Sequence, residues 1–192
     1  ICQNSWGDNF GENGFFYISY YDTNIGTHNV VYTDIENTDN YDHIYQSDLC
    51  GWVGQLGYNK DSIYGANVFT AEGNETLKAA SFYATGKDSQ YELYVVRQFE
   101  DETSLEKMIP VASGKLGNAG YYTVDFNQGI EVDAGERYAV VLYIITPGSV
   151  HPMAIEYAAD EATENVDLDD GESYISANGS KWVSVDTVET VS

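Results

Sequence analysis

The sequence predicts a mostly β protein, an antiparallel β-sandwich or jelly-roll-like domain that follows a short terminal strand segment. From residue 65 onward, short runs of β-branched and aromatic residues recur at regular spacing. Turn-forming sequences such as "EGNE", "TGKDS", "DAGE" and "TPGS" separate these runs. Many short strands with a turn about every 8–12 residues are typical of sandwiches and jelly rolls. One stretch alone, "DETSLEKM", has the composition of a helix.

The expected strands follow one another closely along this part of the chain. They cover residues 66–71, 76–84, 90–99, 121–126, 130–132, 137–145, 153–158, 173–177 and 181–185. Alternation in the third of them places Tyr91, Leu93 and Val95 on one face. The expected helix is short, covers residues 101–108 and ends before Pro110, which cannot continue it.

The chain upstream of residue 65 has a different texture. Residues 15–21, "FFYISYY", have the aromatic and β-branched content of a buried strand. Residues 23–64 are dense in Asn, Asp, Tyr and Gly, and contain one short strand candidate, "VVYT" at 30–33. Structureless connections longer than about 15 residues are uncommon inside one compact domain. We therefore expect residues 23–64 to be a linker with partial structure that leads into a sandwich at 65–192.

Composition excludes several classes of partner. The chain carries 31 acidic and 8 basic residues, for a formal net charge of −23. Such a surface repels phosphate backbones and anionic lipid, so we expect no nucleic-acid partner. No apolar run approaches the roughly 20 residues that span a bilayer, so we expect no transmembrane segment in this chain. Two cysteines do not make a disulfide framework, and two thiols are the favoured state of Cys2 and Cys50.

The opening stretch "NSWGDNFGENGFF", residues 4–16, resembles the asparagine segment of papain-like cysteine peptidases. In that family Asn-Ser-Trp-Gly is followed by an aromatic-Gly pair, Glu, Gly and a strand. The single departure is Phe10, where the family usually has Trp. The resemblance implies that the Asn4 side-chain oxygen orients the catalytic histidine, and that Trp6 shields this contact from water. The alternative is a chance Asn-Ser-Trp-Gly in a β-turn.

The family's order of catalytic residues decides where the rest of the site belongs. In papain-like enzymes the cysteine comes first, then the histidine, then the asparagine. We therefore expect the nucleophile and the histidine on sequence upstream of this chain, and residues 1–22 to be the C-terminal remnant of a peptidase domain. Cys2 lacks the family's cysteine motif, and Cys50 with His43 follows Asn4, which is the wrong order.

The part from about Tyr41 to Val185 is similar to the lectin-like β-sandwich found after papain-like peptidase domains in secreted or surface proteins of anaerobic microbes. The stretches "GWVGQLGY", "GANVFTAEGNETLKAASFYA", "AGERYAVVLYI" and "ESYISANGSKW" carry this similarity. It implies an extracellular or cell-surface location and a glycan or surface ligand, with a structural brace or spacer as the other role. Trp52 and Tyr58 are the candidate ligand residues, because Gly-rich sequence favours exposed loops there.

A cluster of carboxylates in "DLDDGE" is the other candidate site. Asp167, Asp169, Asp170 and Glu172 carry the hard oxygen ligands that Ca²⁺ prefers. Their spacing does not fit an EF-hand loop, and a solvated acidic turn is the simpler interpretation. We assign no metal site and no cofactor on this evidence.

These observations predict the C-terminal portion of a secreted or cell-surface papain-like cysteine peptidase that carries a lectin-like accessory domain. Its partners would be a protein or peptide substrate of the parent peptidase domain, and a glycan or cell-surface ligand. The rival is a non-catalytic adhesin or carbohydrate-binding module with a degenerate peptidase-like region. The upstream coding sequence separates the two, since only a peptidase holds a cysteine motif and a histidine there.

The chain by itself should show no thiol-dependent hydrolysis of casein or peptide substrates. Loss of the orienting residue alone costs on the order of 10⁴ in kcat in the serine triad, and here the nucleophile itself is missing. The measurement is hydrolysis with and without reducing agent, with Cys50→Ala as the control. Turnover that Cys50→Ala abolishes would contradict the assignment.

Overall fold

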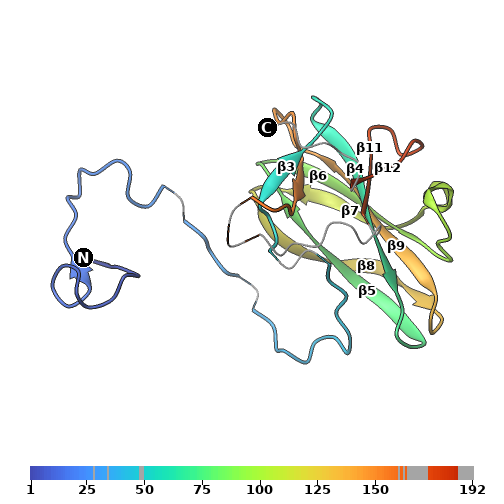
Figure 1. The fold of residues 1–192 in the computed structure, drawn as a ribbon, viewed down its shortest axis with the longest axis horizontal. Coiled ribbons are helices and arrows are strands. Elements are labelled where there is room, and N and C mark those ends of the chain that lie inside the picture. The colour runs from blue at the N-terminus through green and yellow to red at the C-terminus, as the bar shows by residue number, and fades with distance from the viewer. Residues whose placement is uncertain are drawn as a thin grey trace. The chain divides into compact units, whose positions relative to one another are not determined.

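The computed structural model describes residues 1–27, 29–33, 35–47, 50–159, 161, 163 and 173–185. It divides into two compact units, Ile1–Ile44 and Tyr45–Ser192, which are described separately (Figure 1). Residues 45–64, expected to belong to a linker, fall within the second unit. Both cysteines are thiols, as the composition favours.

The first unit holds one short hairpin. Strand β1 (Cys2–Gln3) pairs antiparallel with β2 (Phe15–Phe16), so that Cys2 lies opposite Phe16. The prediction of a buried strand over residues 15–21 is wrong, because the strand ends at Phe16, Phe15 is itself exposed, and the following tyrosines are exposed too. Only two residues of β1 are available to pair with this segment. A segment rich in aromatic residues forms a strand only where a neighbouring strand supplies backbone hydrogen-bond partners. The predicted strand at 30–33 is also wrong, because these residues are exposed and form no strand.

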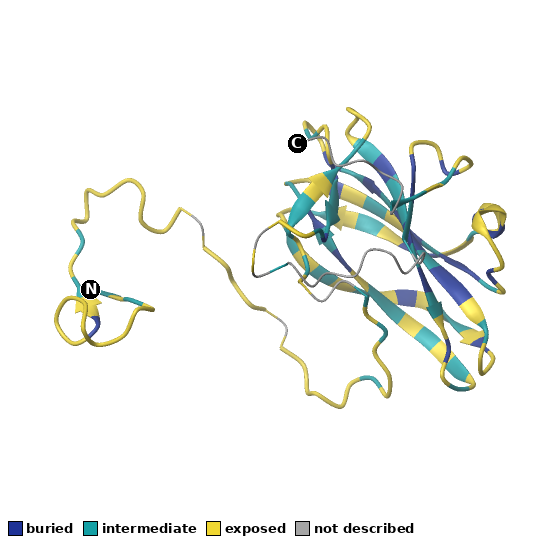
Figure 2. Cartoon of the chain, in the orientation of Figure 1, coloured by how far each residue is buried: buried dark blue, intermediate teal, exposed yellow. Residues whose placement is uncertain are grey.

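The second unit is an antiparallel sandwich, as predicted. Its larger layer is a six-stranded sheet in the order β12-β11-β4-β9-β6-β7, and its smaller layer contains the pairs β5-β8 and β10-β3. The strands are β3 (Gly54–Leu56), β4 (Ser62–Thr70), β5 (Glu75–Ala84), β6 (Ser89–Val96), β7 (Ile109–Leu116), β8 (Gly120–Val132), β9 (Arg137–Ile145), β10 (Met153–Ile155), β11 (Ser173–Ser176) and β12 (Val183–Ser184). Figure 2 shows the buried positions concentrated in these strands.

Strand β9 forms the centre of the larger sheet, between β4 and β6. Its sequence "RYAVVLYII" is almost continuously apolar, which is typical of a strand buried on both faces. Leu142 and Ile144 pack into the main core between the two layers, against residues that include Phe82 and Phe126 of β5 and β8. Ala139 and Val141 pack on the outer face.

A short 3₁₀ helix covers part of that outer face. The helix η1 (Glu102–Glu106) lies within the predicted helix, and its Leu105 is fully buried against Ala139 and Val141. Asp101 caps its start: its carboxylate accepts from the Thr103 backbone N–H at 3.0 Å. This cap starts the helix after the chain leaves β6, and the helical turn places the Leu105 side chain on the sheet.

In the second unit two strands were not expected, and two expected ones are joined. β3 is short, and β7 contains Pro110, Ser113 and Gly114, so neither has a strong strand pattern. β7 is an edge strand, where proline is tolerated. The expected strands 121–126 and 130–132 form the single strand β8, whose register against β5 shifts between Leu77 and Ala79.

A buried carboxylate ties two loops together at one end of the sandwich. Glu136 precedes β9, and its side chain is only 6% exposed. It accepts from Arg97 Nε at 2.9 Å and Nη2 at 2.5 Å, and from the backbone N–H groups of Gln98 and Asp133, each at 3.1 Å. The guanidinium of Arg97 lowers the pKa of Glu136, because its hydrogen bonds favour the charged carboxylate.

Glu136→Gln should lower the free energy of unfolding by about 1–3 kcal/mol at neutral pH, the usual cost of losing charged hydrogen bonds. The folded-state pKa of Glu136 lies below its unfolded value of about 4.3, so its contribution is complete above that pH. The contribution is lost as pH falls through the folded pKa. Urea unfolding of both proteins at pH values from about 3 to about 7 measures the difference in their free energies of unfolding.

The matched control is Glu106→Gln, an exposed carboxylate at the end of η1, which should change little. The difference between the natural protein and Glu136→Gln should narrow toward low pH. A difference that stays constant across the range would contradict the ionic account.

Candidate functional site

The opening loop holds the predicted catalytic residues, and Asn4 closes it. The Asn4 amide nitrogen Nδ2 donates to the Gly14 carbonyl at 2.8 Å and to the Phe10 carbonyl at 3.3 Å. The Asn4 oxygen Oδ1 accepts from the Trp6 backbone N–H at 2.6 Å. A carboxamide oxygen has two lone pairs, so Oδ1 can accept a second hydrogen bond.

Aromatic rings flank this asparagine. Trp6 is 75% exposed and meets Phe10 edge to face, with 5.1 Å between ring centroids. Phe10 meets Phe16 in the same manner at 5.7 Å. Gly11 has φ +68, and a Cβ there would lie 2.2 Å from the Phe15 carbonyl oxygen, so only glycine fits. The structure thus places Asn4 and Trp6 on one small loop, and their catalytic roles stay predictions.

The candidate ligand residues Trp52 and Tyr58 flank strand β3. Their side chains are 37% and 38% exposed. Trp52 lies beside Tyr83 of β5, with ring centroids 6.0 Å apart. Tyr58 takes part in none of the ring contacts found among the described residues, and partial burial raises the pKa of its phenol. The structure therefore does not join the two residues in one aromatic cluster.

Trp52 belongs to an aromatic surface on the outer side of the smaller layer. Tyr83 of β5 lies directly opposite Tyr121 of β8, and their rings are 4.8 Å apart. The next outward pair is Ser81 and Thr123, whose hydroxyl oxygens lie 2.9 Å apart. We call Trp52, Ser81, Tyr83, Tyr121 and Thr123 the aromatic face.

Two local features position the aromatic face. Alternation along β5 buries Phe82 and Ala84 in the core, and so turns Tyr83 outward. A Cβ on Gly51 would lie 2.8 Å from the Tyr83 hydroxyl, so glycine lets the chain pass over that ring. Tyr121 is 58% exposed, and the face therefore offers ring surface and hydroxyl groups to solvent.

Sequence reasoning found Trp52 but missed Tyr83 and Tyr121. The alternation in "TLKAASFYA" was the available signal, since it places Tyr83 opposite to Phe82. Nothing in the sequence gave the register that pairs Tyr83 with Tyr121.

The described residues form no metal site. No three His, Cys, Asp or Glu side chains among them are grouped to hold an ion. The acidic stretch with Asp167, Asp169, Asp170 and Glu172 lies outside the described residues. No helix in the described part of the chain is long and apolar enough to cross a membrane.

Comparison with known families identifies the second unit. A family model described as "Lectin like domain" matches residues 44–192. The chain belongs to this lectin-like family. The predicted lectin-like resemblance is thereby confirmed. No curated protein matches the chain.

Two solved structures are similar to this lectin-like protein. One is the clostridial cysteine protease Cwp84 after propeptide cleavage, with TM-score 0.76 and 25% identity over 97% of this chain and 46% of that one. The other contains the cysteine protease and lectin-like domains of Cwp84, described as a surface layer associated protein of Clostridium difficile. It has TM-score 0.56 and 25% identity over 66% of this chain and 29% of that one. The chain thus spans less than half the length of either.

Proposed function

We propose that the chain is the C-terminal part of a cell-surface papain-like cysteine peptidase whose lectin-like domain binds glycan. The similarity to the Cwp84 protease covers 97% of the chain, although the family model begins only at residue 44. Most of the opening unit therefore takes part in the likeness. This extent supports a peptidase origin for residues 1–22, the segment with the Asn-Ser-Trp-Gly motif.

In this proposal Asn4 orients the histidine of the parent peptidase domain. Its Oδ1 faces a backbone donor in the loop and retains one acceptor position for an imidazole N–H. An amide does this without adding a charge that would disturb a thiolate–imidazolium pair. Trp6 is largely exposed in this chain, and in the proposal its ring covers the Asn–His contact.

The aromatic face is the observation that carries glycan binding. Sugar rings stack on aromatic side chains, and their hydroxyl groups exchange hydrogen bonds with neighbouring polar groups. Trp52 and Tyr121 supply exposed ring surface, and the Ser81–Thr123 pair supplies hydroxyls one register position away. Tethering by such a domain raises the effective concentration of a peptidase at its substrate to the millimolar range.

A cell-surface or extracellular location follows from the same proposal. The similar protein Cwp84 is described as surface layer associated. A formal net charge of −23 suits a protein that works in solution near a polymer surface rather than on anionic lipid. A brace against the peptidase domain is the rival role, in which the aromatic face packs against protein instead of sugar.

Trp52→Ala and Tyr121→Ala should each weaken retention of the chain on insoluble polysaccharide or wall material by about 3–10-fold. This is the worth of one aromatic contact of roughly 0.5–1.5 kcal/mol. The measurement is a sedimentation binding isotherm on cellulose, chitin and isolated cell wall, with and without Ca²⁺. Tyr58→Ala tests the second candidate residue separately.

Ile109→Ala removes an exposed apolar side chain on edge strand β7 and serves as the matched control. It should bind as the natural chain does. Retention on none of the materials, in either condition, would leave the brace as the better account. Unchanged retention in both Trp52→Ala and Tyr121→Ala would show that the binding site is not the aromatic face.

A further inference from the structure

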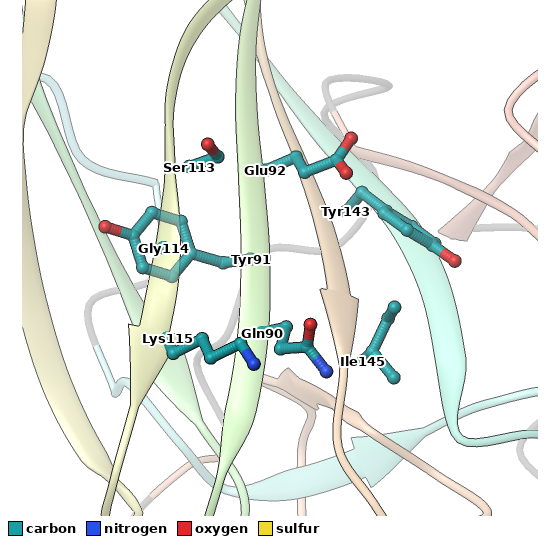
Figure 3. Close-up of a pocket in the computed structure, with 8 residues that line it drawn as sticks. All are labelled: Gln90, Tyr91, Glu92, Ser113, Gly114, Lys115, Tyr143 and Ile145. Atoms are coloured by element: carbon teal, nitrogen blue, oxygen red, sulfur yellow. The ribbon is translucent and has the colours of Figure 1, made fainter.

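A polar hollow lies on the outward face of the larger sheet, on the opposite side of the sandwich from the aromatic face. Strands β6, β7 and β9 line it (Figure 3). Its volume is about 270 Å³. Leu93 and Val95 of β6 point into the main core, so the alternating residues of that strand face the hollow. We define the polar hollow by Gln90, Glu92, Ser113, Lys115, Tyr143 and Ile145.

Strand register arranges these side chains in two rows. Glu92 lies opposite Ser113 on one side and Tyr143 on the other. Gln90 lies opposite Lys115 and Ile145 in the same way. Directly opposed residues on one face have Cβ atoms about 4.5–5.5 Å apart, so each row is within reach of one small molecule.

The walls of the hollow are held in place. The Tyr94 hydroxyl donates a hydrogen bond to the Glu92 carboxylate. Burial raises the pKa of Tyr94, and the hydrogen bond to Glu92 adds to this, so the phenol remains a neutral donor. Tyr143 stacks on Tyr64 with 4.2 Å between centroids, and Trp182 meets Tyr64 edge to face. A preorganised wall binds at a lower entropic cost than mobile side chains do.

We propose that the polar hollow is a second binding site, specific for a short neutral saccharide. A carboxylate accepts hydrogen bonds, an ammonium group donates them, and an amide and a hydroxyl do both. Glu92, Lys115, Gln90 and Ser113 provide this set within one hollow, and a sugar hydroxyl can match every member of it. Tyr143 supplies an aromatic wall beside them.

Charge disfavours apolar and anionic ligands, and size limits the ligand to a small molecule. An apolar ligand would desolvate Glu92 and Lys115 without replacing their hydrogen bonds to water. The formal net charge of −23 and the presence of Glu92 disfavour an anionic polymer. The volume of about 270 Å³ lies just below the roughly 300–1,000 Å³ of most ligand pockets, so the hollow suits a ligand no larger than one or two sugar rings.

The site does not rest on the proposed function of the aromatic face, because its residues lie on the other sheet. With both sites occupied, one domain would hold two glycan segments on opposite sides. Binding of a second segment would then be intramolecular on a shared polymer network, with the avidity that this brings.

Backbone amide shifts of the whole chain, followed by NMR during titration with cellotriose, maltotriose and chitotriose, test the proposal. At least one probe should produce saturable shifts at Gln90, Glu92 and Lys115. Glu92→Gln should weaken that binding tenfold or more, because it removes a charged acceptor. Tyr94→Phe keeps the ring and loses the donor, so it should weaken binding severalfold at an unchanged Tm.

Glu106→Gln and Trp52→Ala are the controls, and both should leave the hollow's affinity unchanged. Shifts confined to Trp52, Tyr83 and Tyr121 would overturn the second site while supporting the aromatic face. No saturable shift in the hollow with any probe would overturn it, and so would an unchanged affinity in Glu92→Gln. Loss of polysaccharide retention in Trp52→Ala with intact shifts in the hollow would show two independent sites.

Discussion

Burial of strand β9 on both of its faces is the constraint on which the rest of the structure depends. On the inner side Leu142 and Ile144 fill the core between the layers, and on the outer side Ala139 and Val141 lie beneath η1. A slip of one residue would exchange these sets and expose the core, so the pairing of β9 with β4 and β6 is strongly specified. The 3₁₀ helix covers the outer face of β9 only as far as Val141. The next outward residues of the strand, Tyr143 and Ile145, line the polar hollow.

The same logic places the aromatic face on the smaller layer. Phe82 and Phe126 must point inward to meet the residues of β9, and this fixes which side of β5 and β8 faces solvent. Tyr83 and Tyr121 then become direct neighbours through the register of those two strands. Both candidate ligand surfaces are therefore consequences of core packing, and all their residues except Trp52 sit on rigid strands rather than on loops. This rigidity favours recognition of a fixed ligand shape.

The sequence predicted the sandwich because long apolar strands such as 137–145 have local signals strong enough to read. The sequence-based prediction was wrong where strand formation depends on pairing with another strand. Residues 15–21 have strand composition, but in the described part of the chain only Phe15–Phe16 pair with another strand. β7 escaped notice because its proline, serine and glycine suit an edge strand and hide the alternation. Trp52 was found from its glycine-rich setting, whereas Tyr83, Tyr121 and the hollow needed the register, which a single sequence does not contain.

Native-state hydrogen exchange tests this account most directly. If burial on both faces of β9 organises the fold, the amides of Val141 and Leu142 should exchange only through global unfolding. Their opening free energy should equal the free energy of unfolding from urea denaturation, while residues 15–21 should exchange through far cheaper local opening. An opening free energy of the β9 amides well below the global free energy of unfolding would contradict the account. So would protection of residues 15–21 equal to that of β9.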